Sequence, residues 1–534
     1  MKRLFRLEHI PYLLSSAICG LLVGALIFCF KYIASLVITL SSDIYAFVRA
    51  NPIYLPLMVV GAAILGLAAS LILKVAPEGK GGGIPTAIAV LRGLISFNWV
   101  KSLFSMFTSA MLTYLCAVPL GNEGPSVQMG TAVGRGCMRL LSKDDSPFDR
   151  YIMTGGACAG FAAATAAPLT GVLFAFEEAH KRFSPLVFCV SSVSAVSACI
   201  SMDLLCELTS TPYALFHFSN VPQLPIVYIP SALVVGVMCG LCAIVLSWGY
   251  DKVRDVLSFK LAKLSFAVKV TVIFIIVSLL GFLSADFTGS GHHLVDELVL
   301  GEGVWYFLLL ALLVRAVLLI FANNIGVTGG LFVPALAFGA LSGALSAKLL
   351  VALQLIPTEY YSVCVIIGIA SVLAAFSHTP LMAIAFSLEA LGAADNILPT
   401  IIGVTVAYLF VEKFARAPFT DLVIEAKAED AHKGRVAHSL DVQLTACPDS
   451  FIIGKEIRDI LWPPMLVVRS IEPNPAITSR ESDFVYEGDK LSVHLVTYDP
   501  KETIRILESY LGKQPSECFA DITQNENKDI IPQI

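Results

Sequence analysis

Charged side chains are scarce in this sequence. Only 14% of its 534 residues are Asp, Glu, Lys or Arg, whereas soluble domains carry about 25%. The net charge is −5, and no basic cluster in the sequence indicates binding to nucleic acid. Because 56% of the residues are hydrophobic, the chain lacks the polar groups needed to cover its surface in water. Much of that surface must face lipid.

Paired cysteine motifs and catalytic constellations are also missing. The cysteines lie mostly within apolar runs, and Cys239 and Cys242 form a lone CxxC without a second pair. This pattern is typical of small packing residues rather than of a zinc or redox site. His292 and His293 lie in a Gly/Ser loop, which favours a solvated loop over a metal pair. With no nucleophile–base pair in sight, we expect neither an enzyme nor a metal or cofactor site.

Long apolar runs, by contrast, recur along the whole chain, and a spanning helix needs about 20 such residues. This rule predicts roughly ten to a dozen membrane segments, several too short to cross fully. Short segments beside Gly and Pro suit half-spanning helices, whose bare backbone must line protein or water. The basic start at residues 1–6 predicts a retained first helix and a cytoplasmic N-terminus in a multi-pass cell-membrane protein.

Two patterns occur twice in the chain. Gly121–Gly130 and Gly330–Gly339 both read as G, three residues, P, four residues, G, at an offset of 209 residues. Pro168–Glu177 and Pro380–Glu389 share their internal spacing, at an offset of 212 residues. Gly/Pro breaks at matching positions of a duplicated apolar chain are typical of transporters, whose broken helices meet near the bilayer midplane.

The composition changes near Lys413, where charged residues become frequent. We expect an all-α polytopic membrane protein with two inverted repeats and broken half-helices, followed by a small cytoplasmic α/β domain. The expected parts are a membrane domain at 1–422 with halves at about 50–205 and 225–412, a charged linker at 423–436, a soluble domain at 437–515 and a flexible tail at 516–534.

Alternating and helical patterns predict the elements of the soluble domain. The predicted strands cover 440–444, 465–471 and 491–496, and the predicted helices cover 454–460 and 500–511.

Three glycine-rich loops lead into a proline at the start of an expected helix: Gly79–Pro85, Gly121–Pro125 and Gly329–Pro334. Glycine lets the backbone turn tightly, and proline fits the first helical turn. Each loop therefore presents bare N–H groups and a partial positive charge. We expect the three helix starts to converge on an anion site. Because such a site has no full positive charge, an anion is able to leave it again.

Two acids in this region suit proton transfer. Glu123 lies inside a glycine–proline loop, where its carboxylate could occupy the anion site and leave it when protonated, acting as both gate and proton carrier. Glu177 and Glu178 precede the basic residues 180–182, which indicate a cytoplasmic boundary. Because Glu389 matches Glu177 in the other half, we expect a structural role for Glu177. The unmatched Glu178 is the better candidate for a proton relay.

The motifs Gly81–Pro85, Gly121–Gly130 and Gly330–Pro334 together resemble those of the CLC family of chloride channels and proton-coupled chloride exchangers. The resemblance extends over residues 15–422 and implies a homodimer in which each subunit holds its own pathway between inverted halves. It implies that Glu123 is the gating glutamate and Glu178 the internal proton glutamate. Having both acids resembles the exchangers, so we expect chloride/proton antiport. A passive chloride channel stays open as the alternative.

The resemblance also implies a set of anion-binding positions and two departures from the family pattern. The implied positions are Gly82, Gly83, Gly124, Leu331, Phe332 and Phe419. Gly82 stands where the family usually has serine, and Phe419 stands where a tyrosine hydroxyl normally closes the central site. We therefore expect a site built from backbone N–H groups, water and ring edges.

The segments 446–455 and 486–491 resemble the C-terminal (TrkA-C) module of bacterial potassium-transport regulators. Such modules dimerise, and some bind a cyclic dinucleotide such as c-di-AMP at the dimer interface. A dimerisation domain without a ligand is the alternative, and both readings stay open here.

Overall fold

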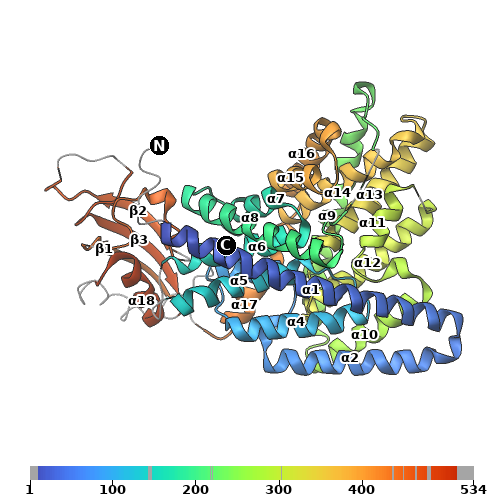
Figure 1. Cartoon of the computed structure of the whole chain (residues 1–534), viewed down its shortest axis with the longest axis horizontal. Helices are drawn as coiled ribbons and strands as arrows, with labels where there is room; N and C mark the ends of the chain where they lie inside the picture. Colours follow the sequence, from blue (N-terminus) through green and yellow to red (C-terminus); the bar gives the residue numbers. More distant parts are fainter. Residues whose placement is uncertain are drawn as a thin grey trace.

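The computed structural model describes most of the chain (Figure 1). The described residues are 10–141, 147–216, 218, 221–301, 303–435, 438–448, 450–463, 466–477, 483–498 and 500–513. The basic start at 1–6 and the expected flexible tail at 516–534 lie outside them.

The first half of the membrane region contains eight α-helices in the described residues. They are α1 (Ile10–Ala50), α2 (Leu55–Val75), α3 (Gly83–Leu91), α4 (Trp99–Leu115), α5 (Glu123–Leu141), α6 (Asp149–Thr165), α7 (Pro168–Phe174) and α8 (Pro185–Thr209). A single π-helical turn, Ala175–Ala179, follows α7 and carries two adjacent acids.

The second half repeats this arrangement and ends in one further helix. Its helices are α9 (Ser231–Phe259), α10 (Phe266–Leu283), α11 (His292–Val299), α12 (Trp305–Ile325), α13 (Phe332–Ala352), α14 (Tyr361–Ser377), α15 (Pro380–Glu389), α16 (Ile397–Phe414) and α17 (Phe419–His432). Proline begins both α7 and α15. Ala166 and His378, which end α6 and α14, adopt the left-handed conformation at φ 56° and 62°. Both halves therefore break the chain in the same way.

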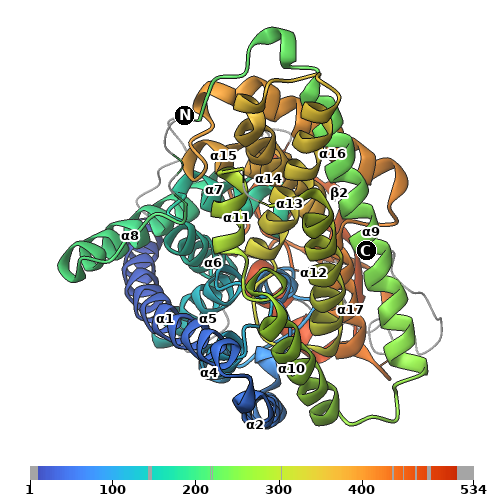
Figure 2. The same ribbon diagram turned by 90° about the vertical axis from the view of Figure 1, so that its right-hand side faces the viewer.

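The two halves contact each other through matching residues. Gly121 and Gly330 exchange backbone hydrogen bonds in both directions, at 2.8 and 2.7 Å, as an isolated antiparallel bridge. Figure 2 shows the first-half helices on one side and the second-half helices on the other, with α7 and α15 side by side between them. This mutual pairing is what inverted repeats are expected to produce.

Glu177 and Glu389 cap helices across the boundary between the halves. The Glu177 carboxylate accepts from the N–H groups of Leu381 and Met382, at 2.9 and 2.6 Å, in the first turn of α15. The Glu389 carboxylate accepts from the N–H groups of residues 169 and 170, both at 2.8 Å, in the first turn of α7. A carboxylate at a helix N-terminus is stabilising. The structural role expected for Glu177 agrees with these contacts.

Nine helices in the described residues are long and apolar enough to cross a membrane. Helices α3, α7 and α15 have only 9, 7 and 10 residues, so they cannot span a bilayer alone. Large apolar side chains such as Leu57 and Ile64 on α2 and Ile200 on α8 are exposed to 60% or more. These faces are suited to lipid. The predicted mostly helical, polytopic membrane fold is confirmed.

The C-terminal domain is a three-stranded antiparallel sheet in the order β1-β3-β2 with one helix. Its elements are β1 (His438–Thr445), β2 (Leu466–Glu472), β3 (Lys490–Thr497) and α18 (Pro500–Leu511). Leu444, Leu491, Val493 and Leu507 belong to a core separate from that of the membrane helices. These elements confirm the predicted strands and the predicted helix at 500–511.

Two expectations near this domain need correction. The helix predicted at 454–460 is a single 3₁₀ turn, Ile457–Asp459, because Gly454 has φ 69° and Glu456 pairs with Phe484 in an extended bridge. The linker expected at 423–436 is helical up to His432 as part of α17. The first turns of this helix are apolar, and residues 422–424 are buried at 2% exposure or less.

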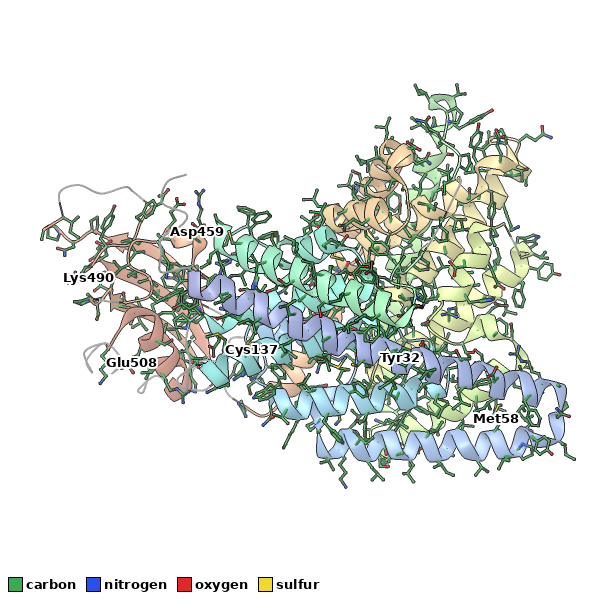
Figure 3. All side chains as sticks on the ribbon, viewed as in Figure 1. Tyr32, Met58, Cys137, Asp459, Lys490 and Glu508 are labelled. Carbon is green, nitrogen blue, oxygen red and sulfur yellow. The ribbon has the colours of Figure 1, made fainter. Side chains whose placement is uncertain are left out.

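Figure 3 shows the two ends of the molecule. Asp459 lies where the C-terminal domain meets the membrane helices, and Met58 of α2 lies at the opposite end. We call these the domain end and the distal end. Helix α1 runs between them, with Tyr32 near its middle.

Candidate functional site

The three predicted helix starts lie together in the structure. Gly82 and Leu331 are the N-cap residues of α3 and α13. A Cβ atom added to Gly83 would lie 2.0 Å from the carbonyl oxygen of Gly124, and one added to Gly124 would lie 2.5 Å from the Cα atom of Gly330. Only glycine permits such close backbone approach. The glycines of the motifs are therefore required for α3, α5 and α13 to begin side by side.

A small cavity of about 20 Å³ lies at the starts of α3 and α13. It is lined by Ile84, Pro85, Glu178, Leu331, Phe332, Ala335, Leu373, Phe376, Ser377, Met382 and Thr420. A volume of this size holds about one water-sized particle. Leu331, Phe332 and Glu178 thus share one space, whereas Gly82, Gly83 and Gly124 form the contact between the helix starts.

Phe419, which the resemblance implies as an anion-binding position, lies close to the small cavity through its neighbours Phe376 and Thr420. In the described part of the chain it is not among the residues that line the small cavity. Its ring is fully buried, stacks on Phe376 at 4.5 Å between centroids and meets Tyr250 edge-on at 5.0 Å. The next residue, Thr420, lines the cavity, and its hydroxyl donates to the carbonyl oxygen of Phe376 at 3.4 Å. The cavity therefore contains a hydroxyl that the sequence reading had not assigned.

A second, larger cavity of about 680 Å³ lies toward the distal end. Its charged or titratable lining residues are Lys31, Asp43, Tyr45, Arg49, Tyr114, Asp286, His292 and His293. Asn122, which immediately precedes Glu123, also lines it. This cavity is therefore the distal approach to the helix starts.

Glu123 is fully buried at the start of α5. The N–H groups of Asn122 and Glu123 lie near its carboxylate, but neither oxygen has a hydrogen-bond partner among the described residues. The Nε2 atom of His292 lies 3.7 Å from Oε1, and Lys31 of α1 acts on the carboxylate electrostatically. An ionised carboxylate without hydrogen bonds is costly to bury. Protonation of Glu123, or its displacement by an anion, would remove that cost.

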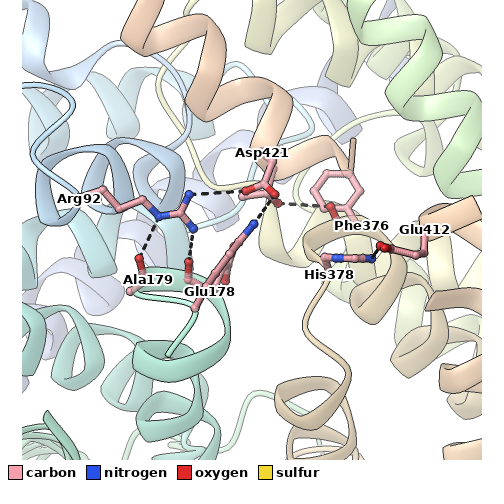
Figure 4. A network of polar contacts seen from close by, with 9 residues as sticks. Arg92, Glu178, Ala179, Phe376, His378, Glu412 and Asp421 are labelled. Atoms are coloured by element: carbon pink, nitrogen blue, oxygen red, sulfur yellow. Dashed lines mark hydrogen bonds and ion pairs between the residues drawn. The ribbon is translucent and has the colours of Figure 1, made fainter. Parts of the chain in front are cut away.

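Glu178 is 4% exposed and lies on the π-helical turn after α7. The Arg92 guanidinium donates to the carbonyl oxygens of Glu178 and Ala179 at 2.7 and 3.0 Å. Arg92 and Lys181 both pair with Asp421 of α17, at 3.8 and 2.6 Å (Figure 4). These contacts fix the backbone of the turn. Since π-helical turns are frequent at functional sites, the anchored turn is a suitable support for a proton-transferring side chain.

A cation from α17 also lies at the loop before α3. The Lys427 ammonium donates to the carbonyl oxygen of Lys80 at 2.7 Å. Burial lowers the pKa of Lys427 to about 8. This contact ties α17 to the first glycine loop, which is a reason to regard α17 as part of the membrane domain.

The C-terminal domain contacts the same region through residues 459–462. Arg150 of α6 donates to the carbonyl oxygens of Leu91, Leu461 and Trp462, at 3.0 Å to Leu91 and 3.2 Å to Leu461. The Tyr151 hydroxyl donates to the carbonyl oxygen of Asp459 at 3.0 Å and accepts from the N–H of Leu461 at 2.8 Å. The Leu461 side chain is fully buried with the membrane-domain core. Arg150 thus links the docked segment to Leu91, which is next to Arg92 in the chain.

Sequence reasoning missed several residues of this site. These residues come from segments far apart in the sequence: His292, Lys31, Arg92 and Thr420. The only one of them that the sequence pattern singled out is His292, as part of the histidine pair. The solvated loop expected at His292 and His293 is instead the first turn of α11. The His293 side chain is solvated at 86% exposure, whereas the His292 side chain is only 29% exposed and faces Glu123. The described residues contain no group of three or more possible metal ligands.

Comparison with known proteins decides the family. Residues 61–412 match the family model described as voltage gated chloride channel, which is more than half of the chain. The chain belongs to the CLC family. The family resemblance predicted from the three motifs is therefore confirmed.

Curated relatives in the family are named as exchangers. The H(+)/Cl(−) exchange transporter ClcA of Klebsiella pneumoniae (strain 342) is 27% identical over 397 residues, which cover 72% of this chain and 82% of the relative. The ClcA of Salmonella arizonae is 26% identical over 433 residues, covering 79% of this chain and 90% of the relative. These relatives are transporters, which agrees at the family level with the expectation of a non-enzyme.

Solved CLC structures share the fold. A slow cyanobacterial Cl−/H+ antiporter superposes with a TM-score of 0.73 at 23% identity, covering 79% of this chain and 99% of that chain. A CLC-type fluoride/proton antiporter superposes with a TM-score of 0.63 at 19% identity, covering 78% of this chain and 99% of that chain. The membrane region is therefore a CLC fold.

Proposed function

We propose that this protein exchanges chloride for protons across a membrane. The observation that carries the proposal is the placement of two buried acids at the helix starts. Glu178 lines the small cavity together with Leu331 and Phe332, and Glu123 is buried beside the larger one. A channel needs no proton path, whereas an exchanger needs titratable groups on both sides of its anion site. The exchanger names of the ClcA relatives support the same reading.

In the proposed cycle, ionised Glu123 blocks the anion site and leaves it when protonated. Chloride then binds at the starts of α3, α5 and α13, at the backbone of Gly82, Gly83, Gly124, Leu331 and Phe332. Glu178 passes protons between this region and the domain end. The Glu123 carboxylate competes with chloride for the site until a proton neutralises it. Chloride can therefore enter only when Glu123 has taken up a proton, and this couples the two fluxes.

We infer that the domain end faces the cytoplasm of a bacterial cell, with both termini on that side, and that the protein is a homodimer as the family resemblance implies. Basic residues gather at the domain end, among them Arg92, Arg150, Lys181 and Arg182. Positive charge is characteristic of cytoplasmic ends. This distribution supports the proposed orientation.

Chloride-driven proton movement tests the proposed function. The purified full-length protein in lipid vesicles is given a chloride gradient without a pH gradient, and the internal pH is followed. We expect chloride leaving the vesicles to drive protons in, against the pH difference that develops. Chloride flux without proton movement would instead show a passive channel, the alternative that the missing side-chain hydroxyls at Gly82 and Phe419 favour. Protein-free vesicles are the control.

We further propose that residues 437–515 form a regulatory module of the TrkA-C type, with a cyclic dinucleotide such as c-di-AMP as its proposed ligand. The docking of residues 459–462 onto Arg150 and Tyr151 supports a regulatory role. Arg150 also binds the carbonyl oxygen of Leu91, beside the arginine that holds the Glu178 turn. A ligand that moves the domain would therefore act on that turn.

Undocking the domain should abolish regulation but keep transport. A buried charge is costly without a partner, so Leu461→Asp should release the domain from α6. Val467→Asp, at a position of β2 that is 60% exposed, is the matched control. Chloride flux in vesicles is measured with and without c-di-AMP for the unmodified protein, the two variants and a chain that ends at residue 436. We expect the truncated chain and Leu461→Asp to transport without responding, while Val467→Asp responds as the unmodified protein does.

If c-di-AMP leaves the chloride flux of the unmodified protein unchanged, c-di-AMP is not the ligand. If the truncated chain does not transport chloride, the domain is needed for transport itself and its role is not regulatory. The truncation must follow α17, since ending the chain near residue 424 would remove Lys427 and its bond to the loop before α3.

A further inference from the structure

His292 connects the buried carboxylate of Glu123 to the large distal cavity. It is the first residue of α11, and its Nε2 atom lies 3.7 Å from Oε1 of Glu123. Its other ring nitrogen, Nδ1, forms a 2.8 Å hydrogen bond with the hydroxyl of Ser290. The serine therefore orients the ring so that Nε2 points toward the carboxylate.

The exposure of the two residues differs sharply. The His292 side chain is 29% exposed and lines the cavity of about 680 Å³, whereas the Glu123 side chain is 0% exposed. The Phe216 ring lies 5.7 Å from the imidazole between centroids and covers part of it. The imidazole of His292 can thus contact water in the cavity. It also faces the carboxylate of Glu123, which that water does not reach.

The other polar groups near Glu123 or beside the start of α11 are held by backbone contacts. Lys31 of α1 donates to the carbonyl oxygen of Ala164 at 2.7 Å, and the Tyr114 hydroxyl of α4 donates to that of Gly121 at 2.9 Å. Arg315 of α12 donates to the carbonyl oxygens of residues 286, 288 and 289.

The remaining charged groups belong to the cavity wall or to the outer face of α11. Asp43, Arg49 and Asp286 line the cavity, and His293 pairs with Glu297 at 3.3 Å on the exposed side of the helix. Among the described ion-pair contacts, the one recorded for the Glu123 carboxylate is with His292. Burial and Lys31 lower the pKa of His292 to about 4, so the ring is neutral near pH 7 and takes up a second proton only briefly.

We propose that His292 transfers protons between water in the distal cavity and Glu123. An imidazole nitrogen takes a proton from cavity water, Nε2 gives its proton to Oε1 of Glu123, and the ring returns to neutral; the reverse sequence releases a proton. No bond other than those to the moving proton is made or broken. The inference deepens the proposed exchange and rests on it.

The pH profile of exchange tests this role. Chloride/proton exchange is measured in vesicles with equal pH on both sides, from about pH 5.5 to 8, for the unmodified protein, His292→Gln and His293→Gln. We expect His292→Gln to slow exchange on the order of tenfold, less than the 10²–10⁴ typical of a positioned acid–base group, because cavity water remains a slower route. The difference in rate from the unmodified protein should grow toward pH 5.5, because burial and Lys31 lower the pKa of His292 to about 4 and the ring is protonated more often as the pH falls. His293→Gln should keep both the rate and the profile.

A second variant separates proton transfer from mere packing. The cavity beside His292 is large enough for a free imidazole, so imidazole added to His292→Ala should restore much of the lost rate. A His292→Gln profile identical to that of the unmodified protein, or a His292→Ala rate that imidazole leaves unchanged, would overturn the proposal. An unmodified protein that moves no protons would instead overturn the proposed exchange, so the two failures are distinguishable.

Discussion

Glu123→Gln is expected to leave chloride flux in place and to abolish the proton movement coupled to it. Glutamine has nearly the shape of a protonated glutamate but never ionises, so it neither competes with chloride as an anion nor carries a proton. Glutamine keeps a side-chain oxygen that can accept from the N–H groups of Asn122 and Glu123 near the carboxylate, so the substitution preserves the surroundings of the side chain. Proton flux should fall by at least about 100-fold, the lower range for losing an essential proton-transferring group. Chloride efflux and internal pH, recorded in the same vesicles, measure the two fluxes separately.

Two further variants make this result specific. Glu297→Gln removes an acid from α11 that pairs with His293 on its exposed face, and it should keep full coupling. Glu123→Ala, which removes the side chain altogether, should show the same uncoupled flux as Glu123→Gln. Chloride-driven proton uptake that survives undiminished in Glu123→Gln would contradict the role assigned to the acid.

Local signals in the sequence predicted the helix starts and the two-fold relation of the halves. Glycine and proline act on the backbone at their own positions, so the repeated motifs predicted where α5, α7, α13 and α15 begin. The close contact of Gly83 with Gly124 and the paired bonds of Gly121 and Gly330 follow from those same residues.

Side-chain contacts between distant segments were not predictable in this way. His292 faces Glu123 because α11 packs on α13, which in turn contacts α5. Nothing in the sequence near either residue indicates this packing. Phe419 and Thr420 differ by one position, yet adjacent residues of a helix point in different directions. The resemblance to the family implied an anion-binding role for the ring of Phe419. The geometry of α17 places the next residue, Thr420, in the lining of the small cavity.

Glu178→Gln is the second variant expected to have a large effect. The side chain lines the small cavity, while its backbone carbonyl is held by Arg92. Because glutamine preserves the shape and cannot release a proton, the anion site should stay intact and the proton route to the domain end should be closed. We expect proton movement to fall by about 100-fold or more while chloride flux survives.

The neighbouring Glu177 provides the matched control for this variant. Its carboxylate accepts two backbone hydrogen bonds from the first turn of α15, so Glu177→Gln should lower stability by about 1 kcal/mol, as the loss of a helix cap does, while coupling is preserved. Thermal unfolding in detergent and the chloride-to-proton ratio in vesicles measure the two effects independently. If Glu178→Gln still moves protons with chloride, or if Glu177→Gln no longer does, the proton relay does not run through Glu178. The paired result depends on a single difference between adjacent acids: one caps a helix of the other half, and the other lines the small cavity at the starts of α3 and α13.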